Sequence, residues 1–179
     1  KTLIMGILNA TPDSFSDGGR YNTVEVAVAK AKQLVADGAD IIDVGGESTR
    51  PGAEFVPVDE ELSRVIPVIE AISKEVDVPI SIDTYKSEVA KQAIKAGAHI
   101  INDVWGGKAD SRMVEVVADL DVPYIIMHNR KKDTYSSFIR DAIYDLYESI
   151  QLAKNAGVRD EHIILDPGIG FAKDLTLNI

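Results

Sequence analysis

Short apolar runs alternate along this chain with longer amphipathic stretches. The short runs are rich in Ile and Val and predict strands over residues 3–8, 40–44, 79–83, 99–102, 123–128 and 162–166. The longer stretches repeat apolar residues every three or four positions and predict helices over residues 24–37, 58–76, 86–96, 111–120 and 137–156. Three of these helices are followed by a glycine where a left-handed residue often ends a helix: Gly38, Gly97 and Gly157.

The alternation of strand and helix is typical of a parallel sheet that helices cover. A polar residue ends each predicted strand: Asn9, Asp43, Asp83, Asn102, His128 and Asp166. A single Asp or Asn at such a place is usually a helix cap or a turn residue. A series of six favours a closed barrel, because the carboxyl ends of its parallel strands converge on one rim. An open sheet would instead concentrate its site at one switch point. We therefore expect an α/β fold of the TIM (β/α)8 barrel type.

The length of the chain sets a limit on this expectation. Such barrels usually need about 250 residues, whereas the chain has 179. We expect about six of the eight strand-helix units, with the last one cut off inside "AKDLTLNI". No linker or low-complexity segment divides the chain, so we expect a single barrel domain over residues 1–179 that is incomplete at its C-terminus.

Composition narrows the classes of partner. The formal net charge is −10 and the sequence pI is about 4.7, which disfavours binding to nucleic-acid backbones and anionic membranes. No Cys occurs, so the chain has neither disulfides nor thiolate metal sites. The early apolar run over residues 3–8 is too short for a membrane span. We expect a cytoplasmic protein that binds neither nucleic acid nor membranes.

Three of the strand-end residues form a set with its own chemistry. Asp83, Asn102 and Asp166 offer two carboxylates and an amide, which suit the edge of a flat heterocycle with adjacent N–H and NH₂ donors. Taken singly, each is more often a helix cap than a ligand contact. Two carboxylates at the rim could also be the catalytic pair of a glycosidase. One Trp and 6% aromatic residues give little surface for stacking on a sugar, which disfavours that alternative.

The segment "GGESTRPG", residues 45–52, supplies the cationic group that the acidic rim lacks. Two glycines allow the backbone to approach a ligand, Thr49 offers a hydroxyl group, and Arg50 offers a forked cation that suits phosphate. An ordinary loop with a solvated Arg is the alternative interpretation. Asn9 carries a neutral oxygen beside the polar loop "LNATPDSFSDGG". With a pyrophosphate nearby, this oxygen could complete the coordination of Mg²⁺.

Five segments together resemble the signatures of dihydropteroate synthase in order and spacing. They are "MGILNATPDSFSDGG", "GGESTRPG", "SIDT", "GAHIIND" and "LDPGIGF", and the match runs through the whole chain. The resemblance implies a TIM barrel enzyme of folate biosynthesis. Members of this family join 4-aminobenzoate to 6-hydroxymethyl-7,8-dihydropterin diphosphate and release pyrophosphate with Mg²⁺. It also implies small-molecule substrates and a homodimer.

The resemblance assigns a role to each matching position. The pterin would be held by Asp83, Asn102 and Asp166, with Met127 and Phe171 lining its pocket. Thr49 and Arg50 would contact the diphosphate or the aminobenzoate, and Asn9 would contact the magnesium ion. A lid and a second loop would close the aminobenzoate pocket, through Phe15, Ser16 and Asp17 on the first and Pro51 and Gly52 on the second. The catalytic residues implied are Asp17, Arg50 and Asp83.

Two alternatives stay open beside this interpretation. The first is a pterin-binding barrel of the methyltetrahydrofolate methyltransferase type, which uses a similar carboxylate and amide set. It has no need of a diphosphate and metal loop, so "LNATPDSFSDGG" and "STRPG" argue against it. The second is a catalytically dead pterin-binding module. A Ser-Arg-Lys-Ser-type loop and an Arg-Val-His segment belong to the family and are absent from this chain, which leaves the second alternative open.

Overall fold

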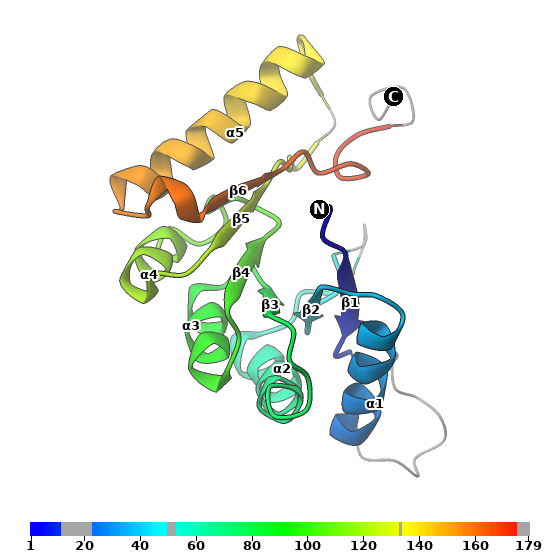
Figure 1. The fold of residues 1–179 in the computed structure, drawn as a ribbon. Helices are drawn as coiled ribbons and strands as arrows, with labels where there is room; N and C mark the ends of the chain where they lie inside the picture. The colour runs from blue at the N-terminus through cyan, green and yellow to red at the C-terminus, as the bar shows by residue number, and fades with distance from the viewer. Residues whose placement is uncertain (12–22, 50–52, 133, 175–179) are drawn as a thin grey trace. The chain divides into compact units, whose positions relative to one another are not determined.

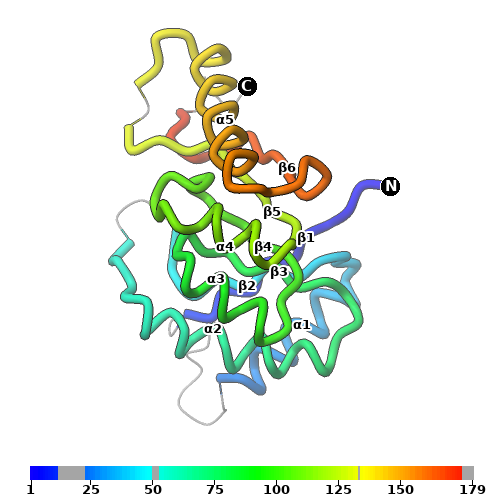
Figure 2. Tube along the Cα trace, turned by 90° about the vertical axis from the view of Figure 1, so that its left-hand side faces the viewer, coloured from blue at the N-terminus to red at the C-terminus, as the bar shows by residue number. Residues whose placement is uncertain are grey.

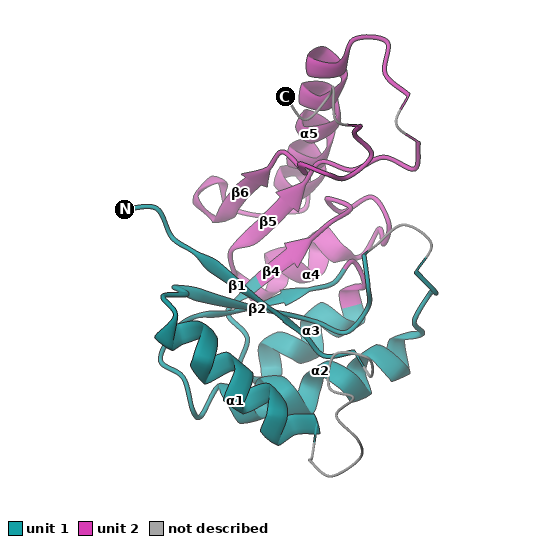
Figure 3. Cartoon of the chain, turned by 90° about the vertical axis from the view of Figure 1, so that its right-hand side faces the viewer, with its two compact units in different colours: residues 1–84, 88–100 teal, residues 85–87, 101–179 magenta. Residues whose placement is uncertain are grey.

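The computed structural model describes residues 1–11, 23–49, 53–132 and 134–174. The chain divides into two compact units (Figure 3). Unit 1 comprises residues 1–84 and 88–100, and unit 2 comprises residues 85–87 and 101–179. The expectation of one domain stays a prediction, and the two units are described separately below.

Strands and helices alternate through the described residues as the sequence pattern predicts (Figure 1). The strands are β1 (Met5–Asn9), β2 (Ile41–Gly45), β3 (Ile80–Asp83), β4 (Ile100–Asp103), β5 (Tyr124–Met127) and β6 (Ile163–Asp166). The helices are α1 (Thr23–Ala36), α2 (Val58–Ile72), α3 (Ser87–Ala96), α4 (Met113–Leu120) and α5 (Phe138–Asn155), with a short 3₁₀ turn η2 (Asp160–His162) before β6. All eleven predicted elements are confirmed, with bounds that differ by a few residues.

Unit 1 is built on three neighbouring parallel strands, β1, β2 and β3. Because side chains alternate along a strand, Leu8, Val44 and Ile82 share one face, and all three are fully buried. Helix α1 packs against β1, β2 and α2. The helices contribute the rest of this buried apolar core, from Ala27 and Ala31 of α1, Val65, Val68, Ile69 and Ile72 of α2, and Val89, Ala90 and Ala93 of α3.

Unit 2 carries the neighbouring parallel strands β4, β5 and β6. Helix α5 packs against β5 and α4, as the Cα trace also shows (Figure 2). The buried core of this unit comes from Ile101 of β4, Tyr124 and Ile126 of β5, Met113 and Val117 of α4, and Ala153 of α5. No helix in the described part of the chain is long and apolar enough to cross a membrane.

Three helices are followed by the predicted glycine in a left-handed conformation, and a fourth helix ends at a left-handed residue that was not predicted. Gly38, Gly97 and Gly157 have φ values of 107°, 121° and 100°, a region that L-residues with a side chain rarely adopt. Helix α4 ends instead on Asp121, whose φ of 52° and ψ of 47° are left-handed. Asp tolerates this conformation better than most residues do, but nothing in the sequence pattern marked it as a cap.

Candidate functional site

The strand ends of unit 1 bring two predicted site residues into one row. Asn9 pairs in register with Gly45, and Gly45 pairs with Asp83. The backbone N–H of Ala10 donates to the Gly45 carbonyl at 2.7 Å and extends this pairing beyond β1. A Cβ atom at Gly45 would lie 3.4 Å from Asp83 Oδ2. Gly45 therefore lies directly beside the Asp83 carboxylate, and a side chain at this position would be in van der Waals contact with it.

The prediction that Asp43 ends its strand is wrong. Strand β2 runs on to Gly45, and Asp43 is its central residue. Its side chain is only 2% exposed and accepts a hydrogen bond from the Ser81 hydroxyl group. Asp43 lies two residues before Gly45 and therefore shares its face, one row deeper than Asp83. The buried pair of Asp43 and Ser81 lies one row before the strand ends and does not belong to the row that carries Asn9 and Asp83.

The loop after β2 is packed tightly against helix α2. A Cβ atom at Gly46 would lie 2.7 Å from Val65 Cγ1 and 3.2 Å from Glu61 Cγ, so any other residue there would force these side chains of α2 to shift. Arg64 Nη1 donates to the Gly46 carbonyl at 2.8 Å and ties the same helix to the loop. Thr49, the predicted diphosphate or aminobenzoate contact, is exposed at the end of this described stretch.

Unit 2 places three predicted pterin contacts on one face of its strands. Met127 and Asp166 are register partners at the ends of β5 and β6. Asn102 pairs with Ile125, which lies two residues before Met127 and so shares its face. Met127 is only 4% exposed, whereas Asn102 and Asp166 are half-buried. A nearly buried methionine side chain between an amide and a carboxylate is therefore present within this unit alone.

The Asp166 carboxylate is fixed by one of its two oxygens. The backbone N–H of Gly168 donates to Oδ1 at 2.7 Å, and the Asp166 carbonyl accepts from the backbone N–H of His128 at 2.9 Å. Among the described residues, none donates a hydrogen bond to Oδ2. One oxygen of the carboxylate is thus used for orientation, and the other is open to a ligand donor.

Asp103 is a structurally important carboxylate that the sequence analysis missed. It follows Asn102 directly, so its side chain projects from the opposite face of β4. Asp103 is 1% exposed and accepts hydrogen bonds from the backbone N–H groups of Trp105 at 2.9 Å and Gly107 at 2.8 Å. Burial raises the pKa of this carboxyl group, although these hydrogen bonds and one from Tyr124 oppose the shift. The adjacent pair "ND" was the available signal, because two neighbouring polar residues in a strand must face opposite ways.

A second unpredicted cluster follows β5. The buried His128 lies 2.9 Å from Asp145 Oδ2 through its Nε2 atom, and Arg130 Nε donates to the same oxygen at 2.5 Å. Burial opposes the charge on Asp145, but the bonds from Arg130 and His128 prevail and lower its pKa. Asp145 also borders a cavity of 430 Å³, whose other lining residues are Trp105, Lys108, Ala109, Asn129, Arg130 and Lys131.

The surroundings of the His128 imidazole favour its neutral form. Burial lowers its pKa, and the hydrogen bond to Asp145 opposes this shift without overcoming it. Because a carboxylate only accepts hydrogen bonds, Nε2 carries the proton and Nδ1 is the acceptor. Nδ1 is buried and has no hydrogen-bond partner among the described residues. A buried acceptor without a partner lowers the free energy of unfolding. His128 therefore holds its position beside Asp145 at a cost in stability.

Several predicted site residues lie outside the described part of the chain. They are the lid residues Phe15, Ser16 and Asp17 and the loop residues Arg50, Pro51 and Gly52. Within the described ranges, no group of three or more His, Asp or Glu side chains is arranged to hold a metal ion. Asn9 is exposed at the end of β1, so its carboxamide oxygen suits a single contact to a cation that phosphate and water hold on its other sides.

Comparison with known proteins identifies close relatives across the chain. Residues 5–179 match the family model described as "Pterin binding enzyme". The chain is 61% identical over 173 residues to the dihydropteroate synthase of Bacillus subtilis, covering 97% of this chain and 61% of that protein. It is 58% identical over 179 residues to that of Clostridium beijerinckii, covering 100% of this chain and 66% of the relative. The chain thus spans somewhat less than two thirds of the length of these relatives.

Solved structures agree with the sequence relatives. A Clostridium difficile dihydropteroate synthase in the presence of pteroic acid matches with a TM-score of 0.96 and 51% identity, covering 99% of this chain and 68% of that chain. A Xanthomonas albilineans dihydropteroate synthase with 4-aminobenzoic acid matches with a TM-score of 0.95 and 46% identity, covering 99% and 65%. These structures are TIM barrels, and the prediction of a partial TIM barrel is confirmed.

Proposed function

The chain belongs to the family of pterin-binding enzymes, and from this premise we propose that it carries the pterin-binding part of a dihydropteroate synthase. The reaction would join 6-hydroxymethyl-7,8-dihydropterin diphosphate to 4-aminobenzoate and release pyrophosphate. The observation that carries the proposal is the face shared by Asn102, Met127 and Asp166. Related dihydropteroate synthases are 52–61% identical to the chain.

The proposed pterin contacts follow from the donors and acceptors of the described side chains. The open Oδ2 of Asp166 would accept from the donor edge of the pterin, and the Asn102 amide can both donate and accept. Met127 offers a buried apolar surface to the flat ring. Phe171, which is half-buried, would add an aromatic wall, and Asp83 of unit 1 is proposed as a further pterin contact.

The chemistry proposed is a displacement at the carbon that bears the diphosphate. Positive charge that develops on the pterin side in the transition state would be stabilised by carboxylates such as Asp83. Thr49 would bind an anionic substrate group through its hydroxyl. The roles of Arg50 and Asp17 as catalytic residues, and of the lid, are part of the proposal and fall on residues outside the described ranges. The proposed reaction needs no covalent intermediate with a side chain of the protein.

A magnesium ion is proposed as the cofactor, with Asn9 as the protein contact. When bound, such an ion supplies Lewis-acid neutralisation of the leaving pyrophosphate. The described residues fit this role because Asn9 offers one exposed neutral oxygen in the row of strand ends that also carries Asp83. Homodimer assembly and a cytoplasmic location complete the proposal. Both rest on family resemblance, and sedimentation equilibrium of the full-length protein tests the first.

Calorimetric titration of the full-length protein with the pterin diphosphate, with and without Mg²⁺, tests the assignment. We expect binding that requires the metal and turnover when 4-aminobenzoate is added. Asp166→Asn should weaken pterin binding about tenfold or more, because an amide N–H then faces a ligand donor. Asp119→Asn, an exposed carboxyl on α4, is the matched control and should bind normally.

The alternatives give different outcomes in the same experiment. Pterin binding that is independent of metal would contradict the synthase and favour the methyltransferase-type barrel. Tight binding with no turnover would identify a catalytically dead module. Normal affinity in Asp166→Asn would remove this residue from the pterin pocket while leaving the reaction itself in place.

A further inference from the structure

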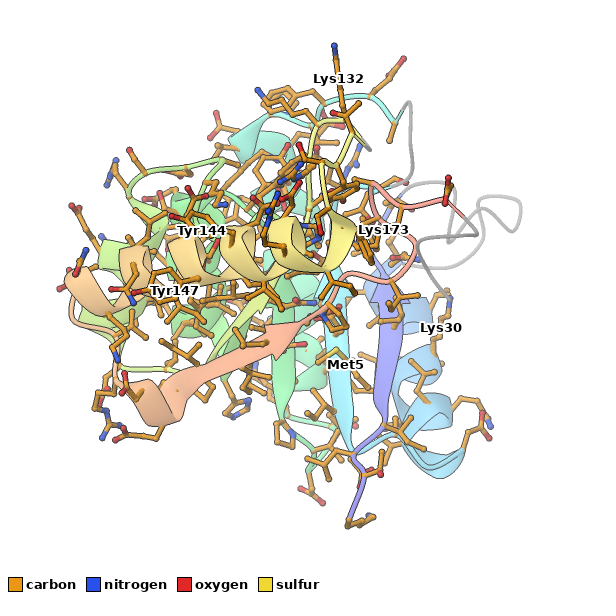
Figure 4. The ribbon with its side chains drawn as sticks, turned by 90° about the horizontal axis from the view of Figure 1, so that it is seen from above. Met5, Lys30, Lys132, Tyr144, Tyr147 and Lys173 are labelled. Carbon is orange, nitrogen blue, oxygen red and sulfur yellow. The ribbon has the colours of Figure 1, made fainter. Side chains whose placement is uncertain are left out.

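The turn that follows β6, residues 166–171, is closed by a lysine that lies two residues beyond its end. Lys173 Nζ donates to the Gly168 carbonyl at 2.9 Å and to the Phe171 carbonyl at 2.7 Å. The Gly168 carbonyl also accepts from the backbone N–H of Phe171 at 2.9 Å. One ammonium group therefore bridges both ends of the turn. Lys173 lies on the segment after β6 (Figure 4), and its side chain is half-buried.

This turn connects the two residues of unit 2 that the proposal assigns to either side of the pterin. At its start, the backbone N–H of Gly168 orients the Asp166 carboxylate through Oδ1. At its end stands Phe171, whose N–H and carbonyl are both engaged by the turn. The spacing and orientation of Asp166 and Phe171 consequently depend on how firmly Gly168 is held.

We propose that Lys173 is a positioning residue, which fixes the 166–171 turn so that Asp166 and Phe171 are presented together to the pterin. The inference rests on the proposed function, because the pterin is the ligand concerned. Lys173 acts through the backbone of Gly168 and Phe171 and needs no contact with the substrate. An ammonium has three donors on a compact head, which allows it to bond two carbonyls of one turn.

Electrostatics support the same role. Burial lowers the pKa of Lys173, while the negative charges of Asp166 and Asp145 oppose the shift. The two carboxylates thus favour the ammonium form of Lys173, which is the form that donates to the two carbonyls. A second anchor holds the segment just beyond the turn, where the Tyr135 hydroxyl donates to the Ala172 carbonyl at 2.8 Å. Arg130 lies 4.5 Å from the centre of the Tyr135 ring.

The test compares Lys173→Met, Lys173→Arg and Lys132→Met in the full-length protein. Met keeps the length and removes the donors, Arg restores a donor, and Lys132 is an exposed lysine of the same unit that supplies the control (Figure 4). The measurements are the dissociation constant for the pterin diphosphate, the KM for 4-aminobenzoate, kcat, Tm, and the hydrogen exchange of the Phe171 amide.

We expect Lys173→Met to weaken pterin binding about tenfold, the scale set by charge-assisted hydrogen bonds. The Phe171 amide should exchange faster by a similar factor, and the KM for 4-aminobenzoate should stay unchanged. Lys173→Arg should recover most of the affinity. A purely structural lysine would instead lower Tm and leave the affinity of the folded enzyme intact, which would overturn the inference.

Failure of the inference and failure of the proposed function look different in these data. If the wild-type protein does not bind the pterin diphosphate, the proposed function is wrong. If the wild type binds and Lys173→Met binds equally well, only the positioning role is lost. The hydrogen exchange of the Phe171 amide is measured without ligand, so an unchanged exchange rate in Lys173→Met would refute the positioning role of Lys173 in either case.

Discussion

The hydroxyl group of Tyr124 donates to Asp103 Oδ2 at 2.7 Å, and both side chains are buried. The two residues come from neighbouring strands, β5 and β4. Tyr124 thus provides the side-chain donor for a buried carboxylate whose other partners are backbone N–H groups. The contact raises the pKa of the Tyr124 hydroxyl, after burial as the larger cause, so it remains a donor at any ordinary pH.

Replacing Tyr124 with Phe should destabilise the protein by about 1.5–3 kcal/mol, because a buried carboxylate loses a donor. The measurement is urea-induced unfolding at neutral pH. Tyr144, which is 66% exposed on α5, gives the control Tyr144→Phe with little change expected (Figure 4). Equal effects of the two substitutions would show that the Tyr124 hydrogen bond contributes nothing specific.

The burial of the Asp103 carboxylate also predicts how the stability of the protein depends on pH. The folded pKa of Asp103 is raised, so the folded state binds more protons than the unfolded state between the unfolded value, about 3.9, and the folded one. Its contribution to stability is therefore complete below the unfolded pKa and declines as pH rises through the folded pKa. Asp103→Asn should remove this decline from the stability profile while keeping an oxygen acceptor for Gly107. A profile that is identical in the variant would contradict the assignment.

Much of this architecture was predictable from sequence, and the misses have a common cause. The strands were found because buried parallel strands give short runs of Ile and Val, and Gly38, Gly97 and Gly157 were found because positive φ selects glycine. Asp43 was misplaced because an Asp inside a strand looks like a strand end. Its partner Ser81 lies 38 residues away, so no local pattern reveals that its burial is compensated.

In the candidate site, too, the residues marked by a local sequence pattern were predicted and those defined by long-range contacts were missed. Asp83 and Asp166 were placed at strand ends correctly, since the end of an apolar run is a local signal. The pairs Asp103 with Tyr124 and His128 with Asp145 were missed because each joins residues from different elements. Helical periodicity places Asp145 on a polar face of α5, and only the packing of α5 against β5 shows that this carboxylate meets His128.

His128 should make the protein less stable in mild acid. Burial lowers its folded pKa, so below the unfolded value, about 6.5, the unfolded state takes up a proton that the folded state refuses. Stability therefore falls as pH decreases from about 6.5 toward the folded pKa. The charged groups that act on the ring are Asp145, Lys173 and Arg130.

His128→Gln checks this expectation, because the Gln amide can still donate to Asp145. The free energy of unfolding of the variant should fall less steeply than that of the wild type as pH decreases below about 6.5, measured by chemical denaturation at several pH values. The variant should not lose more than about 1–2 kcal/mol at pH 7. A profile that keeps the full wild-type slope would assign the acid sensitivity to other groups.

The two glycines after β2 should respond differently to the same substitution. Gly46→Ala places a methyl group 2.7 Å from Val65 Cγ1 and should destabilise the protein by about 1–3 kcal/mol through overpacking. Gly45→Ala meets Asp83 atoms at 3.4–3.8 Å, which is ordinary contact. It should preserve Tm and instead weaken pterin binding, because the methyl group would lie against the Asp83 carboxylate that is proposed to contact the pterin. The reverse pattern would separate Asp83 from the pterin site.

Gly168 and Gly170 form a matched pair for the turn after β6. Both have positive φ, 67° and 88°, so alanine carries a similar backbone strain of about 1–2 kcal/mol at either position. At Gly170 a Cβ atom would have no neighbour within 4 Å, whereas at Gly168 it would lie 2.0 Å from the His128 carbonyl oxygen. That oxygen belongs to backbone at the end of β5, which is held in the ladder by the bond from His128 N–H to Asp166, so it cannot yield as a flexible side chain would.

Gly170→Ala should therefore cost only the strain, and Gly168→Ala should add a steric term that brings the loss above about 3 kcal/mol. Because Gly168 N–H also orients the Asp166 carboxylate, Gly168→Ala should lose pterin affinity even at temperatures where the protein remains folded. Denaturant unfolding and pterin titration of both variants at 15 °C provide the comparison. Equal stability losses would mean that β5 and the turn move apart freely, and equal pterin affinities would mean that the turn does not determine how Asp166 meets its ligand.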